Sequence, residues 1–243
     1  EIISTEFNPL LKLDLSKNKP NNKIFDQLNN FGHSKYNGQI NKINSYKFSK
    51  LENFNQFNFE PLILSDGVIV FEKKGTIIRF NDNKKVVWKN NFYSKTEKKI
   101  HPTLSFAITD KNLLVADSIA KISNIDLQSG DLIWSKKSEY PFNSEIKIHK
   151  DKFFVADFKN TLRCFYLKDG SECWNIKTEE SFTVSNSKFS ILIRDNLVIY
   201  NNSLGDITAI DISTGLIEWQ LPTQTSSIIC LLYTSDAADE DLR

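Results

Sequence analysis

A segment of roughly fifteen residues that ends in tryptophan recurs four times along the chain. The copies end at positions 88, 134, 174 and 219, at intervals of 46, 40 and 45 residues. Repeats of this length are typical of propeller blades and solenoid units, so they decide the fold before any other feature does. The four copies read GTIIRFNDNKKVVW to Trp88, AKISNIDLQSGDLIW to Trp134, NTLRCFYLKDGSECW to Trp174 and GDITAIDISTGLIEW to Trp219.

Each copy has the residues of a β-hairpin. Apolar side chains precede a polar corner, where Asp126 and Asp211 can accept hydrogen bonds from backbone N–H groups two residues on. A glycine, which reaches positive φ without strain, stands four residues before the tryptophan in the last three copies. The first copy is one residue shorter and has Lys84 there. The three glycines are Gly130, Gly170 and Gly215.

Two further apolar runs precede each hairpin and complete a unit of four short strands. We therefore predict an all-β β-propeller of four-stranded blades over residues 61–229, with about four blades present of an expected eight. Four blades alone would leave both terminal blade faces bare. The runs are GVIVF, LLVAD, FFVAD and LVIY, preceded by PLIL, LSFAI, EIKI and SILI, the strands we expect to face the propeller axis.

The two ends of the chain lie outside this repeat. Residues 1–60 are predicted to be a lead-in segment or linker. The stretch CLLYTSDAADE matches the translation of a transposon-end sequencing adaptor, so we exclude residues 230–243 from the fold. We expect the native protein to continue beyond Ile229. The chain starts at Glu1 and contains no methionine, which leaves room for an upstream export signal.

Charge and hydropathy argue against a nucleic-acid partner and against a membrane span. The formal net charge is +1 and no five Lys or Arg residues are consecutive, so we expect no nucleic-acid binding. No window approaches the roughly 18 apolar residues of a membrane span, so we expect no transmembrane segment.

Residues that could carry chemistry have simpler structural interpretations. The four tryptophans are repeat-equivalent, which favours packing between blades over a converging ligand-stacking set. Asp117 and Asp157 could act as paired acid and base, but both stand just before a turn, which favours turn capping. His33, His101 and His149 have no second ligand at metal spacing. The sequence therefore offers no catalytic, cofactor-binding or metal-binding residue.

Cys164 and Cys173 are candidates for a disulfide. If residues 167–170 form a four-residue loop, the two cysteines face each other across the hairpin, at a Cβ separation of roughly 4.5–5.5 Å. In an exported protein they could be bridged. Two small packed thiols are the alternative.

The hairpin copies also carry a family resemblance. NIDLQSGDLIW and AIDISTGLIEW resemble the signature that closes each blade in quinoprotein-type propellers. Within that group, the Lys-, Asn- and Phe-rich composition most resembles the BamB-like lipoproteins of the outer-membrane β-barrel assembly machinery. The resemblance implies a non-enzymatic scaffold without a cofactor at the periplasmic face of the outer membrane. It also implies a lipid-modified cysteine upstream of residue 1 and a partner in the periplasmic domains of the barrel-assembly outer-membrane protein.

The alternative is a fragment of a PQQ-dependent alcohol or sugar dehydrogenase on the same propeller. Such enzymes are expected to have a vicinal Cys-Cys pair and carboxylate or amide ligands for Ca²⁺, and no Cys-Cys pair occurs here. The expected axis-facing strands supply mostly aliphatic residues and one charged pair, Glu145 and Lys147. We therefore predict that pyrroloquinoline quinone does not bind.

Overall fold

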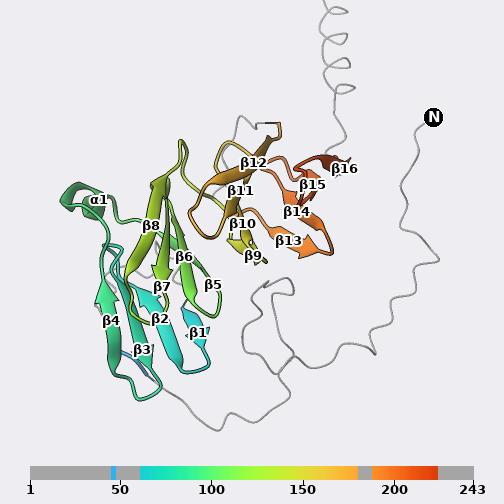
Figure 1. Cartoon of the computed structure of the whole chain (residues 1–243). Coiled ribbons are helices and arrows are strands. Elements are labelled where there is room, and N and C mark those ends of the chain that lie inside the picture. Colours follow the sequence, from blue (N-terminus) through green and yellow to red (C-terminus); the bar gives the residue numbers. More distant parts are fainter. Residues whose placement is uncertain (1–44, 48–60, 180–187, 224–243) are drawn as a thin grey trace, which may run out of the picture.

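The chain folds into successive antiparallel sheets (Figure 1). The structure is a computed structural model and describes residues 45–47, 61–179 and 188–223. Four four-stranded sheets follow one another in chain order, and each is one blade. This confirms the predicted all-β propeller blades. The strands are β1 (Leu62–Leu64), β2 (Gly67–Phe71), β3 (Ile77–Asn81), β4 (Val86–Asn90), β5 (Leu104–Ile108), β6 (Asn112–Asp117), β7 (Lys121–Asp126), β8 (Leu132–Lys137), β9 (Lys147–His149), β10 (Lys152–Ala156), β11 (Thr161–Tyr166), β12 (Glu172–Lys177), β13 (Ile191–Arg194), β14 (Leu197–Asn201), β15 (Ile207–Asp211) and β16 (Ile217–Leu221).

Strands within each blade are paired in sequence order by short turns. The first strands lie innermost, because β9 of the third blade lies beside β5 and β13 of its two neighbours. A parallel bridge between Ser144 and Phe189 adds to this contact. The fourth strand of each blade is consequently the outer edge of its sheet.

A β-bulge recurs at the same place in every hairpin. In the first blade, Phe80 pairs with Val86 and Arg79 pairs with Trp88, so that Val87 has no opposite residue. The same register shift occurs in the other three blades. A bulge increases the local twist of the strand and turns the tryptophan that follows it.

The blades pack face to face through alternating side chains. We call the side of a blade toward the next blade its trailing face and the opposite side its leading face. On β2, Ile69 and Phe71 pack from the trailing face of the first blade against Leu113 and Val115 on the leading face of the second. The same arrangement recurs between the second and third blades and between the third and fourth. Because successive side chains of a strand point to opposite faces of its sheet, the four blades form three apolar interfaces between them.

The two terminal faces differ from each other. Val68, Val70 and Phe80 on the leading face of the first blade are buried, and the ring of Tyr46 lies 5.4 Å from that of Phe80. The expectation that both terminal faces are bare is therefore wrong for this one, because a residue of the lead-in packs against it. On the trailing face of the fourth blade, Trp219 is 43% exposed.

One short helix, α1 (Lys95–Ile100), lies in the connection between the first and second blades. The Ser94 side chain accepts from the Glu97 backbone N–H, and Glu97 accepts from the Ser94 N–H, so the two residues form a capping box. The Ser-x-x-Glu spacing is a known helix-start signal that sequence inspection for long apolar periods misses. His101 ends the helix with a left-handed φ of 57°.

Candidate interaction site

Three of the four repeat tryptophans connect their blade to the next. Each indole Nε1–H donates to a backbone carbonyl of the following blade at 3.1 Å, and this carbonyl lies in the turn before the following blade's tryptophan. The pairs are Trp88 with Leu127, Trp134 with Leu167, and Trp174 with Ile212.

The glycine of each turn lies directly on the tryptophan of the preceding blade. A Cβ placed on Gly130 would lie 2.6 Å from Trp88, and one on Gly170 would lie 2.7 Å from Trp134. Gly215 stands in the same relation to Trp174, at 2.6 Å. Sequence reasoning assigned these glycines to the turn alone, and all three do have positive φ. The contact with the neighbouring ring is a second requirement, which only the three-dimensional arrangement reveals.

A second donor reaches each of the same carbonyls, and its residue type varies. Arg79 donates to Leu127 O at 2.7 Å, and Asn124 donates to Leu167 O at 3.1 Å. Lys152 donates to Ile212 O at 3.1 Å. Arg79 and Asn124 occupy the same position in their blades, on the third strand opposite the tryptophan, whereas Lys152 lies on the second strand of its blade. No sequence pattern could have identified this set, because the residue type changes and the lysine comes from a different strand.

The turn aspartates have the geometry expected of their positions. Asp126 accepts from the backbone N–H groups of Gln128 and Ser129, and the Ser129 bond is the main reason that its pKa is lowered. The pKa of Asp211 is lowered in the same way, chiefly by the Thr214 N–H. The third hairpin has Tyr166 at the equivalent place.

Asp117 and Asp157 cap turns, as predicted. Asp117 Oδ1 accepts from two backbone N–H groups, of Ile119 and Lys121, and its Oδ2 accepts from Tyr93 Oη at 2.6 Å. Burial raises the pKa of Asp117 although these bonds favour the charged form. Asp157 caps the equivalent turn of the third blade and also accepts from Arg163 Nε at 3.0 Å.

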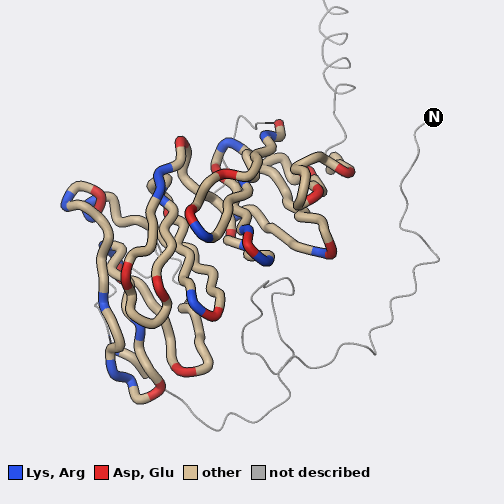
Figure 2. The backbone as a smooth tube through the Cα atoms, in the orientation of Figure 1, with Lys and Arg blue, Asp and Glu red and all other residues tan. Residues whose placement is uncertain are grey.

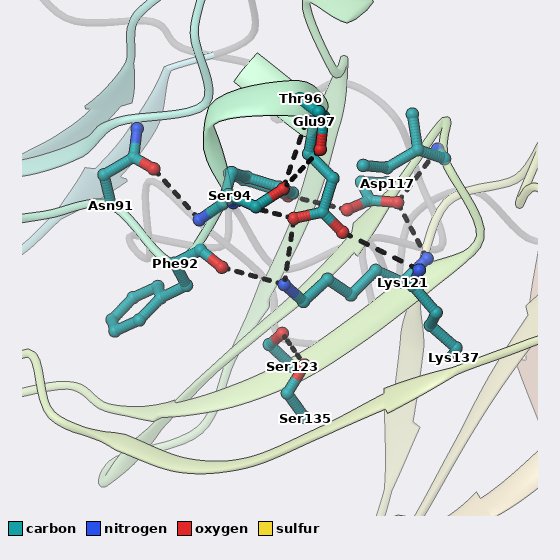
Figure 3. A network of polar contacts seen from close by, with 12 residues as sticks. Asn91, Phe92, Ser94, Thr96, Glu97, Asp117, Lys121, Ser123, Ser135 and Lys137 are labelled. Atoms are coloured by element: carbon teal, nitrogen blue, oxygen red, sulfur yellow. Dashed lines mark hydrogen bonds and ion pairs between the residues drawn. The ribbon is translucent and has the colours of Figure 1, made fainter.

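A polar network joins α1 to the second blade (Figure 3). Glu97 lies 4.0 Å from Lys121 Nζ and 3.9 Å from Lys137 Nζ, and Lys121 also donates to the Phe92 carbonyl. The backbone N–H of Ser94 holds the pKa of Glu97 below its ordinary value, with Lys121 and Lys137 contributing. The network fixes the helix against the edge of the second blade.

The cysteine register differs from the expected one. Cys164 pairs with Trp174, because the recurrent bulge places Cys173 outside the register. Both cysteines are free thiols that pack on the apolar interface between the third and fourth blades. Burial, and then the contact with Cys173, raise the pKa of the Cys164 thiol.

The two histidines within the described ranges lie on different elements. His101 ends α1, and His149 ends β9, where burial lowers its pKa. His33 lies outside the described residues. Within the described ranges, no group of three or more His, Cys, Asp or Glu side chains could hold a metal ion. No helix in those same ranges is both long enough and apolar enough to cross a membrane.

The outer strands present aliphatic side chains to solvent, which sequence reasoning did not single out. Val86 and Val87 at the start of β4 are 52% and 46% exposed. Leu132 and Ile133 at the start of β8 are 42% and 49% exposed. Each pair lies on an edge strand, so main-chain groups and apolar side chains are offered to a partner together.

These features define a β-propeller of the PQQ-like repeat class. The chain belongs to the family described as outer membrane protein assembly factor BamB, which matches residues 56–229. No curated protein sequence matches the chain.

Solved structures share the fold at low sequence identity. BamB from Moraxella catarrhalis is 18% identical with a TM-score of 0.54, over 68% of this chain and 48% of that one. Quinohemoprotein alcohol dehydrogenase ADHIIG from Pseudomonas putida HK5 is 13% identical with a TM-score of 0.54, over 68% and 34%. The computationally designed Ika4 protein is 12% identical with a TM-score of 0.50, over 67% and 96%. The chain thus spans about half the length of the Moraxella protein.

Proposed function

We propose that this chain is part of a non-enzymatic propeller scaffold of the outer-membrane β-barrel assembly machinery. It acts at the periplasmic face of the outer membrane, anchored through a lipid-modified cysteine upstream of residue 1. It binds the periplasmic domains of the barrel-assembly outer-membrane protein. The observation that carries this proposal is the family match over residues 56–229.

The outer strands are the surface that we assign to the partner. An exposed strand edge offers unpaired N–H and C=O groups, and flanking apolar side chains add affinity when a partner strand pairs with it. The aliphatic pairs at the start of β4 and β8 fit this mode of binding. The tryptophans, turn glycines and turn aspartates, in contrast, serve contacts within and between blades.

The test is titration calorimetry of the chain with the purified periplasmic domains of the barrel-assembly protein. We expect saturable binding, weakened about tenfold or more by Leu132→Lys/Ile133→Lys, because edge lysines oppose strand pairing. The matched control Asn83→Lys/Ser129→Lys adds the same charge to two exposed turns and should bind as the unchanged chain does. Absence of binding would contradict the assignment of partner, and equal weakening by both variants would contradict the edge.

The dehydrogenase alternative draws on the fold likeness to the quinohemoprotein alcohol dehydrogenase. On β9, the buried Lys147 ammonium pairs with Glu145 at 2.8 Å, and a quinone tricarboxylate would have to compete with that carboxylate. We therefore expect no heat and no Trp fluorescence change on titration with pyrroloquinoline quinone and Ca²⁺. Saturable binding with dye-linked alcohol or sugar oxidation would favour the enzyme.

A further inference from the structure

Five lysines gather at the end of the first blade where α1 lies. Lys73 and Lys74 form the turn between β2 and β3, and the other three belong to α1. All are exposed except Lys98, which is half-buried. Figure 2 shows the positive charge of α1 on the margin of the molecule. We call this set the basic corner: Lys73, Lys74, Lys95, Lys98 and Lys99.

Hydrogen bonds and packing hold the two parts of the basic corner together. Asn91 Nδ2 donates to the Lys74 carbonyl at 3.0 Å, and the Lys73 carbonyl accepts from His101 Nδ1 at 3.3 Å. Gly75 lies so close to the Tyr93 ring that a Cβ would approach it to 2.5 Å. The lysines therefore project from a fixed platform.

Two carboxylates beside the basic corner are engaged with other lysines. Glu72 forms an ion pair with Lys89 at 3.0 Å. Glu97 lies between Lys121 and Lys137, on the side of the second blade. The basic corner therefore keeps its excess of positive charge toward solvent.

The lysines of α1 repel one another, although Lys98 and Lys99 in the last turn interact favourably with the helix dipole. Residues three and four apart share one helix face, so Lys95 stands beside both Lys98 and Lys99. Like charges at these spacings destabilise a helix, and Lys95 is in the first turn, where the helix dipole disfavours a cation. The capping box of Ser94 and Glu97 offsets this cost. An anionic ligand would relieve the repulsion that remains between the three lysines.

An aliphatic side chain completes the surface. Ile100, the last residue of α1, is 64% exposed, and no residue of the helix is buried. A projecting element that combines lysines with an exposed aliphatic residue fits a lipid interface, where the lysines meet phosphates and the aliphatic residue enters the acyl boundary. An acidic peptide would need the charges but not Ile100.

We propose that the basic corner, together with Ile100, binds the anionic phospholipid headgroups of a membrane surface. This orients the propeller with the α1 end toward the bilayer. The inference goes beyond the scaffold function and does not depend on it, since lipid binding and partner binding are measured separately.

The test is co-sedimentation of the whole chain with phosphatidylglycerol vesicles and with phosphatidylcholine vesicles. We expect binding to the anionic vesicles only, weakening as salt rises from about 0.1 M to about 1 M and the Debye length falls from about 10 Å to about 3 Å. Lys95→Gln/Lys98→Gln/Lys99→Gln should lose about fivefold per lysine, or roughly a hundredfold. Ile100→Ser should weaken binding by about tenfold while leaving the charge unchanged.

The matched control removes three exposed lysines from the opposite end of the blades, as Lys85→Gln/Lys111→Gln/Lys168→Gln, and should bind as the unchanged chain does. The chain without vesicles must stay in the supernatant, and far-UV circular dichroism must be the same for all variants. Equal loss in both triple variants, or equal binding to neutral vesicles, would overturn the proposal. So would binding of a poly-glutamate peptide through the same lysines without vesicle binding, which would indicate an acidic protein partner.

Discussion

Trp88 and Trp219 occupy the same position in their blades and differ in their surroundings. Trp88 is 7% exposed, bonded to Leu127 O and packed on Gly130, whereas Trp219 is 43% exposed. We expect Trp88→Ala to lower the free energy of unfolding by about 3–5 kcal/mol, through lost burial and the cavity left behind. Trp219→Ala should change it by less than about 1 kcal/mol. Urea denaturation of both variants decides, and equal small effects would contradict the interface role of the tryptophans.

A turn glycine can be required for its positive φ or for its close contact with a neighbouring ring, and comparing Gly170 with Gly205 separates the two. Both have positive φ, but a Cβ on Gly170 would meet the Trp134 ring at 2.7 Å, while one on Gly205 would meet only Thr223 Oγ1 at 3.0 Å. Gly205→Ala should therefore cost about 1–2 kcal/mol, from backbone strain alone. Gly170→Ala should cost clearly more, because the ring must also move. Thermal unfolding of the two variants would refute this if their midpoints fell equally.

Three turn aspartates, of which Asp169 is exposed and Asp126 and Asp211 are half-buried, make stability depend on acid pH. Backbone N–H bonds from Ser129 and Thr214 lower the pKa of Asp126 and Asp211, and the Ser171 hydroxyl chiefly lowers that of Asp169. A lowered folded-state pKa gives stability that is fully present above the unfolded value of about 3.9 and is lost as pH falls through the folded value.

The corresponding variant is Asp126→Asn/Asp169→Asn/Asp211→Asn, which keeps the accepting oxygens but removes the titration. We expect its stability to fall less steeply below about pH 4 than that of the unchanged chain. The control Asp195→Asn removes a carboxylate whose side chain is 92% exposed. Denaturant midpoints measured across the acid range test this, and parallel curves for all three proteins would contradict it.

At the scale of elements, the sequence predicted strand content better than strand register. Period-two alternation and turn residues placed all four strands of each blade, because burial on both faces and glycine corners leave a local signal. The β-bulge leaves no local signal in the sequence, since it depends on the twist that lets Trp174 reach the next blade. The second donors Arg79 and Lys152 are equally unpredictable, because their partner carbonyls belong to neighbouring blades. Helix α1 was not predicted, because its sequence has a capping signal but no helical repeat of apolar residues.

The bulge in the third hairpin changes what is expected of its two thiols. Cys173 is out of register but still contacts Cys164. We expect oxidised glutathione to cross-link the two cysteines, which lose two hydrogens as the glutathione disulfide is reduced to two thiols. The reaction should be slow, because burial raises the pKa of Cys164 and the thiolate is the attacking form.

Mass spectrometry of a tryptic digest would show the peptide pair linked. The variant Cys173→Ala should give no such product. A chain that keeps both thiols after prolonged oxidation would show that the bulge holds the sulfur atoms in a geometry unsuited to a disulfide.

At the scale of the molecule, the blades form a quasi-one-dimensional array. Each blade contributes one face to each neighbour, and the apolar clusters lie between sheets. Stability in such an array is the sum of repeat and interface contributions, so the condition of a terminal face matters as much as any inner residue. Tyr46 packs on the leading face of the first blade, so that this terminal face is partly covered.

The trailing face of the fourth blade should make the chain self-associate. Trp219 and Leu221, both 43% exposed, lie there opposite Ala209 and Ile207, and Leu216 nearby is 67% exposed. Contiguous apolar surface of this kind drives association in water, and a face shaped for another blade accepts a second copy most readily. Sedimentation velocity should therefore show a concentration-dependent increase in mass.

Trp219→Ser/Leu221→Ser should reduce that increase. Val86→Ser/Leu132→Ser, which removes two comparably exposed aliphatic residues from outer strands, should not. A chain that stays monomeric at every concentration, or one in which the two double variants behave alike, would mean that the trailing face is not the site of contact. Association through the edges of β4 and β8 would instead show the opposite result, with the second variant alone monomeric.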